Sequence, residues 1–165
     1  MNTAGSAPFV LAPDEGQSFW YLGGVATFKI TNEQTGSWGL SVETFPAGFA
    51  SAFHNHPTED SGFYVLIGEM RVKCGDLEAT ARPGMFVFLP RGVPHAFKVG
   101  ETGPVTWINV QGPTGDFRRL TEEIGEPAPG PVLPPAGIAL PDAAATADAA
   151  RRHNLERLGP SPFDI

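Results

Sequence analysis

Short β-rich segments separated by turn residues follow one another from residue 19 to residue 110 of this chain. Segments such as GVATFKI (24–30), WGLSVETF (38–45) and GFYVLIGEMRVKC (62–74) are rich in β-branched and aromatic residues. The turn sequences PAG, CGD, RPG, PRGVP and GETG stand between such segments. These connections are too short for crossover helices. The pattern therefore predicts an all-β fold, an antiparallel sandwich or barrel, rather than βαβ units.

The segments on either side of this region differ from it in composition. Residues 1–17 contain Pro8 and Pro13 and predict an extended N-terminal arm, which leaves residues 18–112 for the barrel. Residues 113–165 predict a helical and proline-rich extension. It contains a helix at 116–125, an extended linker at 126–135, and an alanine-rich helix from an Asp142 N-cap to Gly159-Pro160.

Composition and charge narrow the range of partners. The 165 residues carry a net charge of −7, and the 11 lysines and arginines are scattered, so a nucleic-acid surface is not expected. No basic leader or membrane-length apolar run is present, which predicts a cytoplasmic protein that meets a small molecule and no membrane. The single cysteine, Cys74, is expected to be a small buried strand residue.

Three histidines indicate a metal site. His54 and His56 are two residues apart, so on a strand they share a face, and His95 follows the turn PRGVP. Three imidazoles from two segments leave coordination positions open, as a catalytic metal requires. The alternative is three buried structural histidines, each needing a partner or a lowered pKa. The fourth histidine, His153, has no such context and is expected on a helix surface.

The spacing of these residues resembles that of the cupins. The first cupin motif is matched by Gly48, His54, His56 and Gly68, and the second by Gly84, Pro90, Gly92 and His95. The chain also looks like the small single-domain proteins described as quercetinase-like cupins. The resemblance implies a jelly-roll β-barrel, or double-stranded β-helix, with short C-terminal helices and a metal inside its mouth. It also implies a homodimer, which exposed sheet edges favour.

The sequence departs from the cupin pattern at two positions. The asparagine position of the second motif holds Val99, and the glutamate position of the first motif holds Ser61. Asp60 has the opposite strand parity to that position, and Glu59 lies about 6.6 Å further along an extended strand. Whether either carboxylate substitutes for the missing ligand is left open by the sequence. Ser61 is either a replacement without a role or a catalytic residue that hydrogen-bonds a substrate oxygen.

Three neutral ligands leave the full charge of a divalent ion available to an anionic substrate. The sequence therefore predicts a metal-dependent oxidoreductase of the dioxygenase type. It would act on a small chelating enolate, phenol or acid, with Fe(II) expected and Mn, Ni, Co or Zn as alternatives. A serine cannot act as the base that quercetinase-like enzymes are thought to use. Two alternatives stay open: a cyclase, isomerase or lyase with an electrophilic metal or none, and a non-catalytic small-molecule binder.

Apolar and basic residues near the histidines are further candidates. The substrate pocket is expected to be lined by Phe63, Val65, Phe86 and Trp107, although Phe63 and Val65 could equally belong to the barrel core. Phe88 is a further candidate for the mouth. Arg118 and Arg119 are expected on a solvated helix face, with capture of an anion as the alternative.

Overall fold

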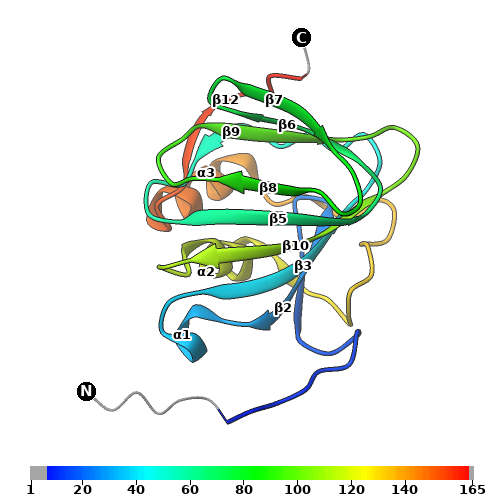
Figure 1. The fold of residues 1–165 in the computed structure, drawn as a ribbon, viewed down its shortest axis with the longest axis vertical. Helices are drawn as coiled ribbons and strands as arrows, with labels where there is room; N and C mark the ends of the chain where they lie inside the picture. The colour runs from blue at the N-terminus through cyan, green and yellow to red at the C-terminus, as the bar shows by residue number, and fades with distance from the viewer. Residues whose placement is uncertain (1–6, 164–165) are drawn as a thin grey trace.

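Two antiparallel sheets face each other in the computed structural model, which describes residues 7–163 (Figure 1). The first sheet has seven strands in the order β11-β1-β2-β3-β10-β5-β8, and the second has five in the order β12-β4-β9-β6-β7. The strands are β1 (Gln17–Tyr21), β2 (Gly24–Ile30), β3 (Gly39–Phe45), β4 (Phe53–Asn55), β5 (Asp60–Ile67), β6 (Met70–Cys74), β7 (Leu77–Ala81), β8 (Phe86–Leu89), β9 (His95–Val99), β10 (Val105–Gly112), β11 (Glu126–Pro127) and β12 (Glu156–Gly159). The all-β jelly-roll prediction is confirmed.

The space between the sheets is filled by an aromatic cluster. Phe45 of β3 stacks on Trp107 of β10 with ring centroids 5.6 Å apart, and Phe63 of β5 lies 5.3 Å from the same indole. Phe97 of β9 reaches across from the second sheet and meets Trp107 edge-to-face at 5.2 Å. These contacts bury large apolar areas and fix how the two sheets pack. Cys74, at the end of β6, is buried as expected.

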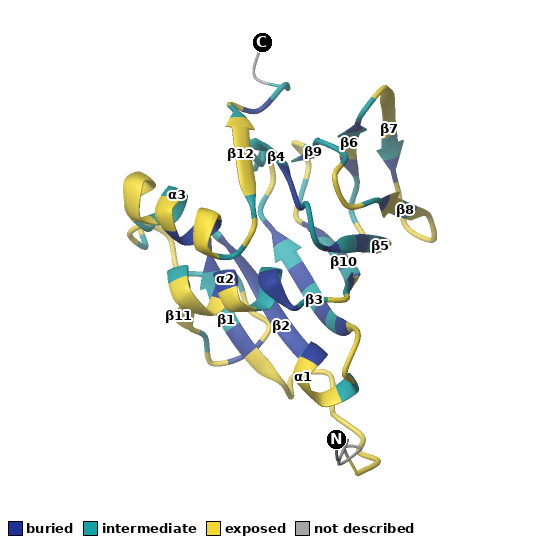
Figure 2. Cartoon of the chain, turned by 90° about the vertical axis from the view of Figure 1, so that its left-hand side faces the viewer, coloured by how far each residue is buried: buried dark blue, intermediate teal, exposed yellow. Residues whose placement is uncertain are grey.

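Of the three helices within residues 7–163, α2 (Asp116–Ile124) contacts β1 and α3 (Ala143–Arg152) contacts β12. The short α1 (Asn32–Thr35) joins β2 to β3, while α2 and α3 follow the last barrel strand. Figure 2 shows α2 lying beside β1 and β2, with α3 above it and to its left in this view. Leu120 of α2 packs on Ala149 and Ala150 of α3. Within residues 7–163, no helix is long and apolar enough to span a bilayer.

The C-terminal helix is shorter than the sequence predicts. The predicted N-cap is confirmed, because the Asp142 carboxylate accepts hydrogen bonds from the backbone N–H groups of Ala144 and Ala145. The helix nevertheless ends at Arg152, since Asn154 has a φ of +52° and Leu155 N donates to the Ala150 carbonyl. An asparagine in the left-handed conformation with this hydrogen bond ends helices. Residues 156–159 then form β12, which pairs with β4.

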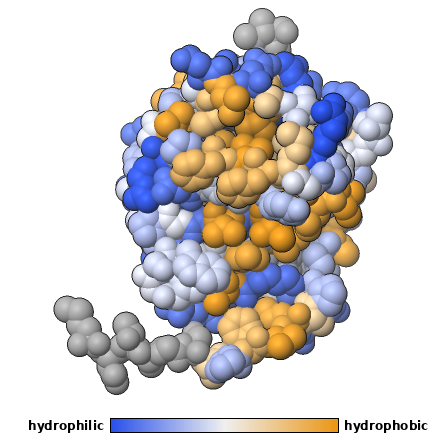
Figure 3. Space-filling model, in the orientation of Figure 1, coloured by the Kyte–Doolittle hydropathy of each residue, from blue (hydrophilic) through white to orange (hydrophobic). Residues whose placement is uncertain are grey.

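An apolar patch lies over β5, β8 and β10 on the outer face of the first sheet (Figure 3). It is formed by Tyr64, Leu66, Ile67, Phe86, Phe88 and Val110, and we call it the outer patch. Phe86 and Phe88 are 63% and 55% exposed. The expectation that Phe86 lines an internal pocket is therefore wrong: β8 turns Val87 and Leu89 toward the core and its phenylalanines outward.

Candidate metal centre

His54, His56 and His95 come together at one end of the barrel interior. His54 of β4 pairs directly with His95 of β9, and His56 follows β4 immediately. One ring nitrogen from each histidine lies within 4.8 Å of the others. The ring centroids are 4.5 Å apart for His54 and His95, and 5.4 Å apart for His56 and His95, whose planes are nearly parallel.

Backbone carbonyls set the tautomers of two of these rings. His54 Nδ1 lies 2.8 Å from the Ala52 carbonyl, and His95 Nδ1 lies 2.9 Å from the Val93 carbonyl. A carbonyl only accepts, so each Nδ1 carries the proton and each Nε2 keeps its lone pair. Ligating histidines in metalloproteins are oriented in the same way.

Burial keeps all three imidazoles neutral. It lowers the pKa of His54 to about 4, and the neighbouring His95 adds to this effect. Burial also lowers the pKa of His56 well below its ordinary value, and that of His95 below its ordinary value. Three neutral rings with free lone pairs at one point are a donor set that fits a divalent first-row metal.

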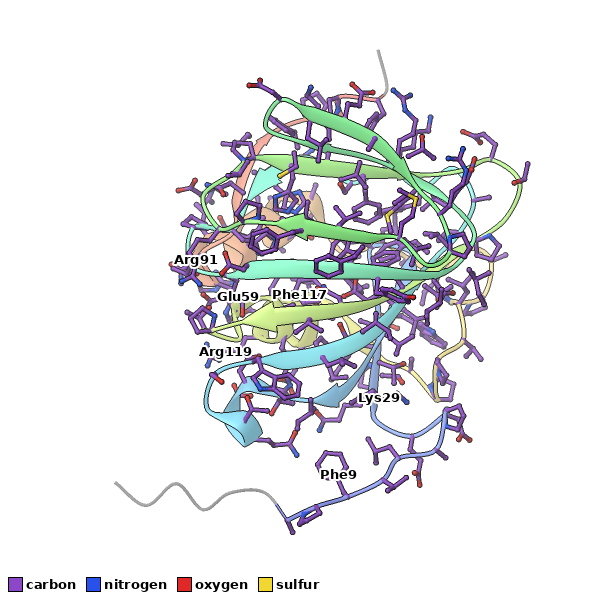
Figure 4. The ribbon with its side chains drawn as sticks, viewed as in Figure 1. Phe9, Lys29, Glu59, Arg91, Phe117 and Arg119 are labelled. Carbon is purple, nitrogen blue, oxygen red and sulfur yellow. The ribbon has the colours of Figure 1, made fainter. Side chains whose placement is uncertain are left out.

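Glu59 does not join the histidines. Its buried carboxylate accepts from the backbone N–H groups of Gly115, at 2.5 Å, and Phe117, at 2.8 Å, at the beginning of α2 (Figure 4). The carboxylate therefore serves as a tertiary cap for N–H groups that have no partner within the helix. Burial raises the pKa of Glu59, while these two hydrogen bonds oppose the rise.

Asp60 and Ser61 also lie outside the donor set. Asp60 is bound by Arg91 through two hydrogen bonds to the guanidinium and one to the backbone N–H. These contacts hold the pKa of the carboxyl below its ordinary value. Ser61 is buried at the start of β5, in register with Gln111 and Leu89. Neither Glu59 nor Asp60 is placed to act as a fourth ligand.

One aromatic side chain lies next to the histidines. Phe117 of α2 lies 6.4 Å from His56 and 5.8 Å from Tyr21, measured between ring centroids. The pocket candidates Phe63, Val65 and Trp107 are all buried, but they belong to the aromatic core. Phe117, which the sequence indicated only as part of a helix, is the aromatic residue that contacts a histidine of the site.

A buried polar cluster inside the barrel is absent from the sequence-based expectations. Glu43 of β3 accepts from Tyr21 Oη at 2.9 Å, from Ser41 Oγ at 2.9 Å and from Asn109 Nδ2 at 2.7 Å. Gln111 Nε2 donates to Ser41 Oγ at 3.0 Å. Burial raises the pKa of Glu43, and it raises that of Tyr21 too. Asn109 Oδ1 and Gln111 Oε1 have no partner among the described residues.

Strand alternation explains why this cluster was missed. In LSVETF (40–45) the apolar Leu40 and Val42 share one face of the strand. Apolar residues are expected to face the core, so this face would be placed inward. The structure turns Ser41, Glu43 and Phe45 inward instead. One sign of this orientation was present in the sequence: the apolar Phe45 lies on the same face of the strand as Glu43.

Comparison with known proteins connects this geometry to a family. A family model described as "Cupin domain" matches residues 41–111, a range that includes all three histidines. A search of curated proteins finds no match. The solved structure of TT1209 from Thermus thermophilus is 30% identical, with 53% of this chain and 83% of that chain covered, and a TM-score of 0.46.

Two further solved structures share the fold at lower identity. KdgF from Halomonas sp. is 18% identical, with 63% of this chain and 93% of that chain covered, and a TM-score of 0.55. A structure described among the DMSP lyases RdDddP and RnDddQII is 19% identical, with 56% of this chain and 48% of that chain covered, and a TM-score of 0.50. Similarity at this level concerns the fold alone.

The role of Glu59 gives a testable prediction. Glu59→Ala leaves two buried backbone N–H groups without an acceptor, at a cost of about 1–3 kcal/mol each. We expect urea denaturation to show the free energy of unfolding reduced by about 3 kcal/mol. Glu101→Ala, which removes an exposed carboxylate paired with Lys98, is the control and should cost about 0.5 kcal/mol or less. Equal effects of the two substitutions would contradict the capping role.

Proposed function

Because residues 41–111 match the model of the cupin domain, we propose that this chain is a metal-dependent enzyme acting on a small anionic, chelating substrate. The observation that carries the proposal is the convergence of three neutral imidazoles, two of them with Nδ1 bound to a backbone carbonyl. His54, His56 and His95 would hold the ion. Fe(II) is the preferred candidate, and Mn, Ni, Co and Zn are alternatives.

The ligand set favours substrates that bring their own negative charge. A divalent ion held by three histidines supplies Lewis acidity and, if it is iron, a site for dioxygen chemistry. Among residues 7–163 no carboxylate side chain joins the histidines, because Glu59 caps α2 and Asp60 binds Arg91. An enolate, a phenolate or a carboxylate could therefore enter without repulsion from a ligand carboxylate. A dioxygenase-type oxidation of such a substrate is the reaction we propose first.

A second reaction class is a lyase, cyclase or isomerase that uses the same histidines. One observation favours it. The catalytic-base position of quercetinase-like proteins holds Ser61, whose hydroxyl is not a base near neutral pH.

We also propose that two copies of the chain associate through the outer patch. Six apolar side chains form one exposed area on the face of β5, β8 and β10. An exposed apolar area of this kind, on a sheet that ends in the edge strand β8, is typical of association surfaces. A second copy provides an isologous apolar surface of the same shape.

Removal of one histidine tests the metal centre. His54→Ala should reduce the bound metal from about one ion per chain to near zero after dialysis, because two ligands do not retain a divalent ion. Elemental analysis measures the metal content, and circular dichroism confirms that the variant is folded. His153→Ala is the matched control, since His153 pairs with Glu123 at the end of α3. If both variants kept their metal, the assignment of the site would be wrong.

Oxygen dependence separates the two reaction classes. We expect the Fe(II)-loaded protein to consume dioxygen in proportion to product formed when it is given small enolates, catechols or hydroxy acids. An oxygen electrode and mass spectrometry provide the measurement. Full turnover under nitrogen, or equal turnover with Zn(II), would exclude the dioxygenase and support the lyase, cyclase or isomerase.

The outer patch gives a prediction for the oligomeric state. Phe88→Glu places a charge within the apolar patch and should convert a dimer into a monomer in size-exclusion chromatography with light scattering. Leu77→Glu is the control, because Leu77 is equally exposed at 55% but lies on β7 in the other sheet. A dimer that persists in Phe88→Glu would show that this face is not the interface.

A further inference from the structure

The chain crosses between the two sheets twice at one end of the barrel. Residues 56–59 lead from β4 to β5, and residues 90–94 lead from β8 to β9. Because β5 and β8 are antiparallel neighbours, the two connections meet the first sheet side by side. His56 begins the first connection, and His95 directly follows the second. How the connections lie against each other therefore decides whether the three imidazoles meet.

The strand pairing positions two of the histidines but not the third. His54 and His95 are directly paired between β4 and β9, and each ring is held by a backbone carbonyl. His56 lies beyond the end of β4, and among residues 7–163 its ring has no hydrogen-bond partner. The position of this imidazole therefore depends on how the backbone of residues 56–59 is held.

The second connection begins with a tight turn that binds two histidines. Val93 N donates to the Pro90 carbonyl at 3.2 Å and closes the turn. Gly92 has a φ of +77°, which the third position of a type II turn requires. Its N–H donates to the His56 carbonyl at 3.0 Å. The Val93 carbonyl is bound to His95 Nδ1 at 2.9 Å, so one turn holds the backbone of one histidine and the ring of another.

One carboxylate fixes this turn to the start of β5. Asp60 Oδ1 accepts from Arg91 N at 2.7 Å and from Arg91 Nε at 3.2 Å, and Asp60 Oδ2 accepts from Arg91 Nη2 at 2.6 Å. We call this contact the Asp60–Arg91 clasp, and Figure 4 shows Arg91 at the same end of the barrel as Glu59. Because both side chains are partly exposed, the ion pair contributes about 1 kcal/mol or less to stability. Its bidentate geometry, by contrast, fixes the orientation of the turn.

We propose that Asp60 and Arg91 are positioning residues of the histidine site and that they act through His56. The clasp holds the turn, and the turn holds the backbone of His56 through the Gly92 N–H, so that its imidazole stays beside the two paired histidines. This placement of the imidazole stands on the contacts themselves, whereas its effect on metal affinity rests on the proposed function. The carboxylate that precedes Ser61 in the sequence serves the site from outside the donor set.

Metal affinity tests the effect of the clasp on the donor set. Titration of the full-length protein with Co(II), in competition with a chromophoric chelator, measures the dissociation constant. Asp60→Ala should weaken Co(II) binding at least about tenfold, as the loss of groups that orient metal ligands does. Asp60→Asn keeps an oxygen acceptor for Arg91 N, so it should weaken binding less than Asp60→Ala. An affinity of Asp60→Ala equal to that of the unsubstituted protein would overturn the proposal.

Two further variants separate this role from a general loss of stability. Glu69→Ala is the matched control, because it removes a comparably exposed ion pair with Arg82 beyond the opposite end of β5. Its affinity for Co(II) should equal that of the unsubstituted protein. Arg91→Ala covers the case in which Asp60→Ala disturbs β5, because it leaves the Asp60 carboxylate in place, and it should also weaken Co(II) binding. Equal weakening by Glu69→Ala and Asp60→Ala, or an unchanged affinity in Arg91→Ala, would contradict the role of the clasp.

Imidazole NMR spectra of the metal-free protein test the placement of His56 without any metal. In Asp60→Ala the resonances of His56 should shift or broaden. Those of His54 should move less, since its ring is held by the Ala52 carbonyl, and those of His153 should stay in place. Unchanged His56 resonances would overturn the proposal. A shift of His56 in a protein that binds no Co(II) would instead leave the placement standing and overturn the proposed function.

Discussion

Glu59 holds α2 against the end of the barrel, and the candidate site depends on this contact. Its carboxylate comes from the segment between His56 and β5, and it binds two N–H groups at the beginning of the helix. The same turn carries Phe117, whose ring centroid lies 6.4 Å from that of His56. Because the carboxylate is only three residues from His56, it links the helix to the segment that carries a histidine of the site. Glu59, which the sequence left open as a fourth ligand, instead binds the beginning of the helix beside the site.

The electrostatics of the site follow from what surrounds each imidazole. Burial makes a proton on any of the three rings costly, and carbonyls of Ala52 and Val93 fix where the remaining protons lie. A donor set prepared in this way binds a cation without a compensating carboxylate. The buried carboxyl group in the interior, Glu43, is bound by three side-chain donors from β1, β3 and β10. The interior therefore separates a cation site from a hydrogen-bonded polar cluster.

The sequence was sufficient for the fold and for the three histidines because both depend on local pattern. Turn residues punctuate the strands, and the histidines keep a fixed spacing on either side of β5 to β8. The alternation of residues along the strands was less informative. Glu43 faces inward because its carboxylate is hydrogen-bonded in the interior, and Phe86 faces outward because the outer face of the sheet is apolar. The role of Glu59 could not be predicted, because its partners lie more than fifty residues away and are backbone groups without a sequence signature. Arg118, whose side chain is only 15% exposed, was expected in solvent because its partner Gln17 lies 101 residues away in the sequence.

The pairing of β12 with β4 has a consequence for how the chain can be divided. β4 is three residues long, and His54 meets β9 through a single paired position, while β12 borders the other side of the strand. Arg157 stands opposite His54 in that pairing. The segment matched by the family, 41–111, thus lacks the strand that flanks its own first histidine. The C-terminal segment that contains β12 therefore supports the strand that carries His54. Exchanging this segment between relatives would alter the site itself.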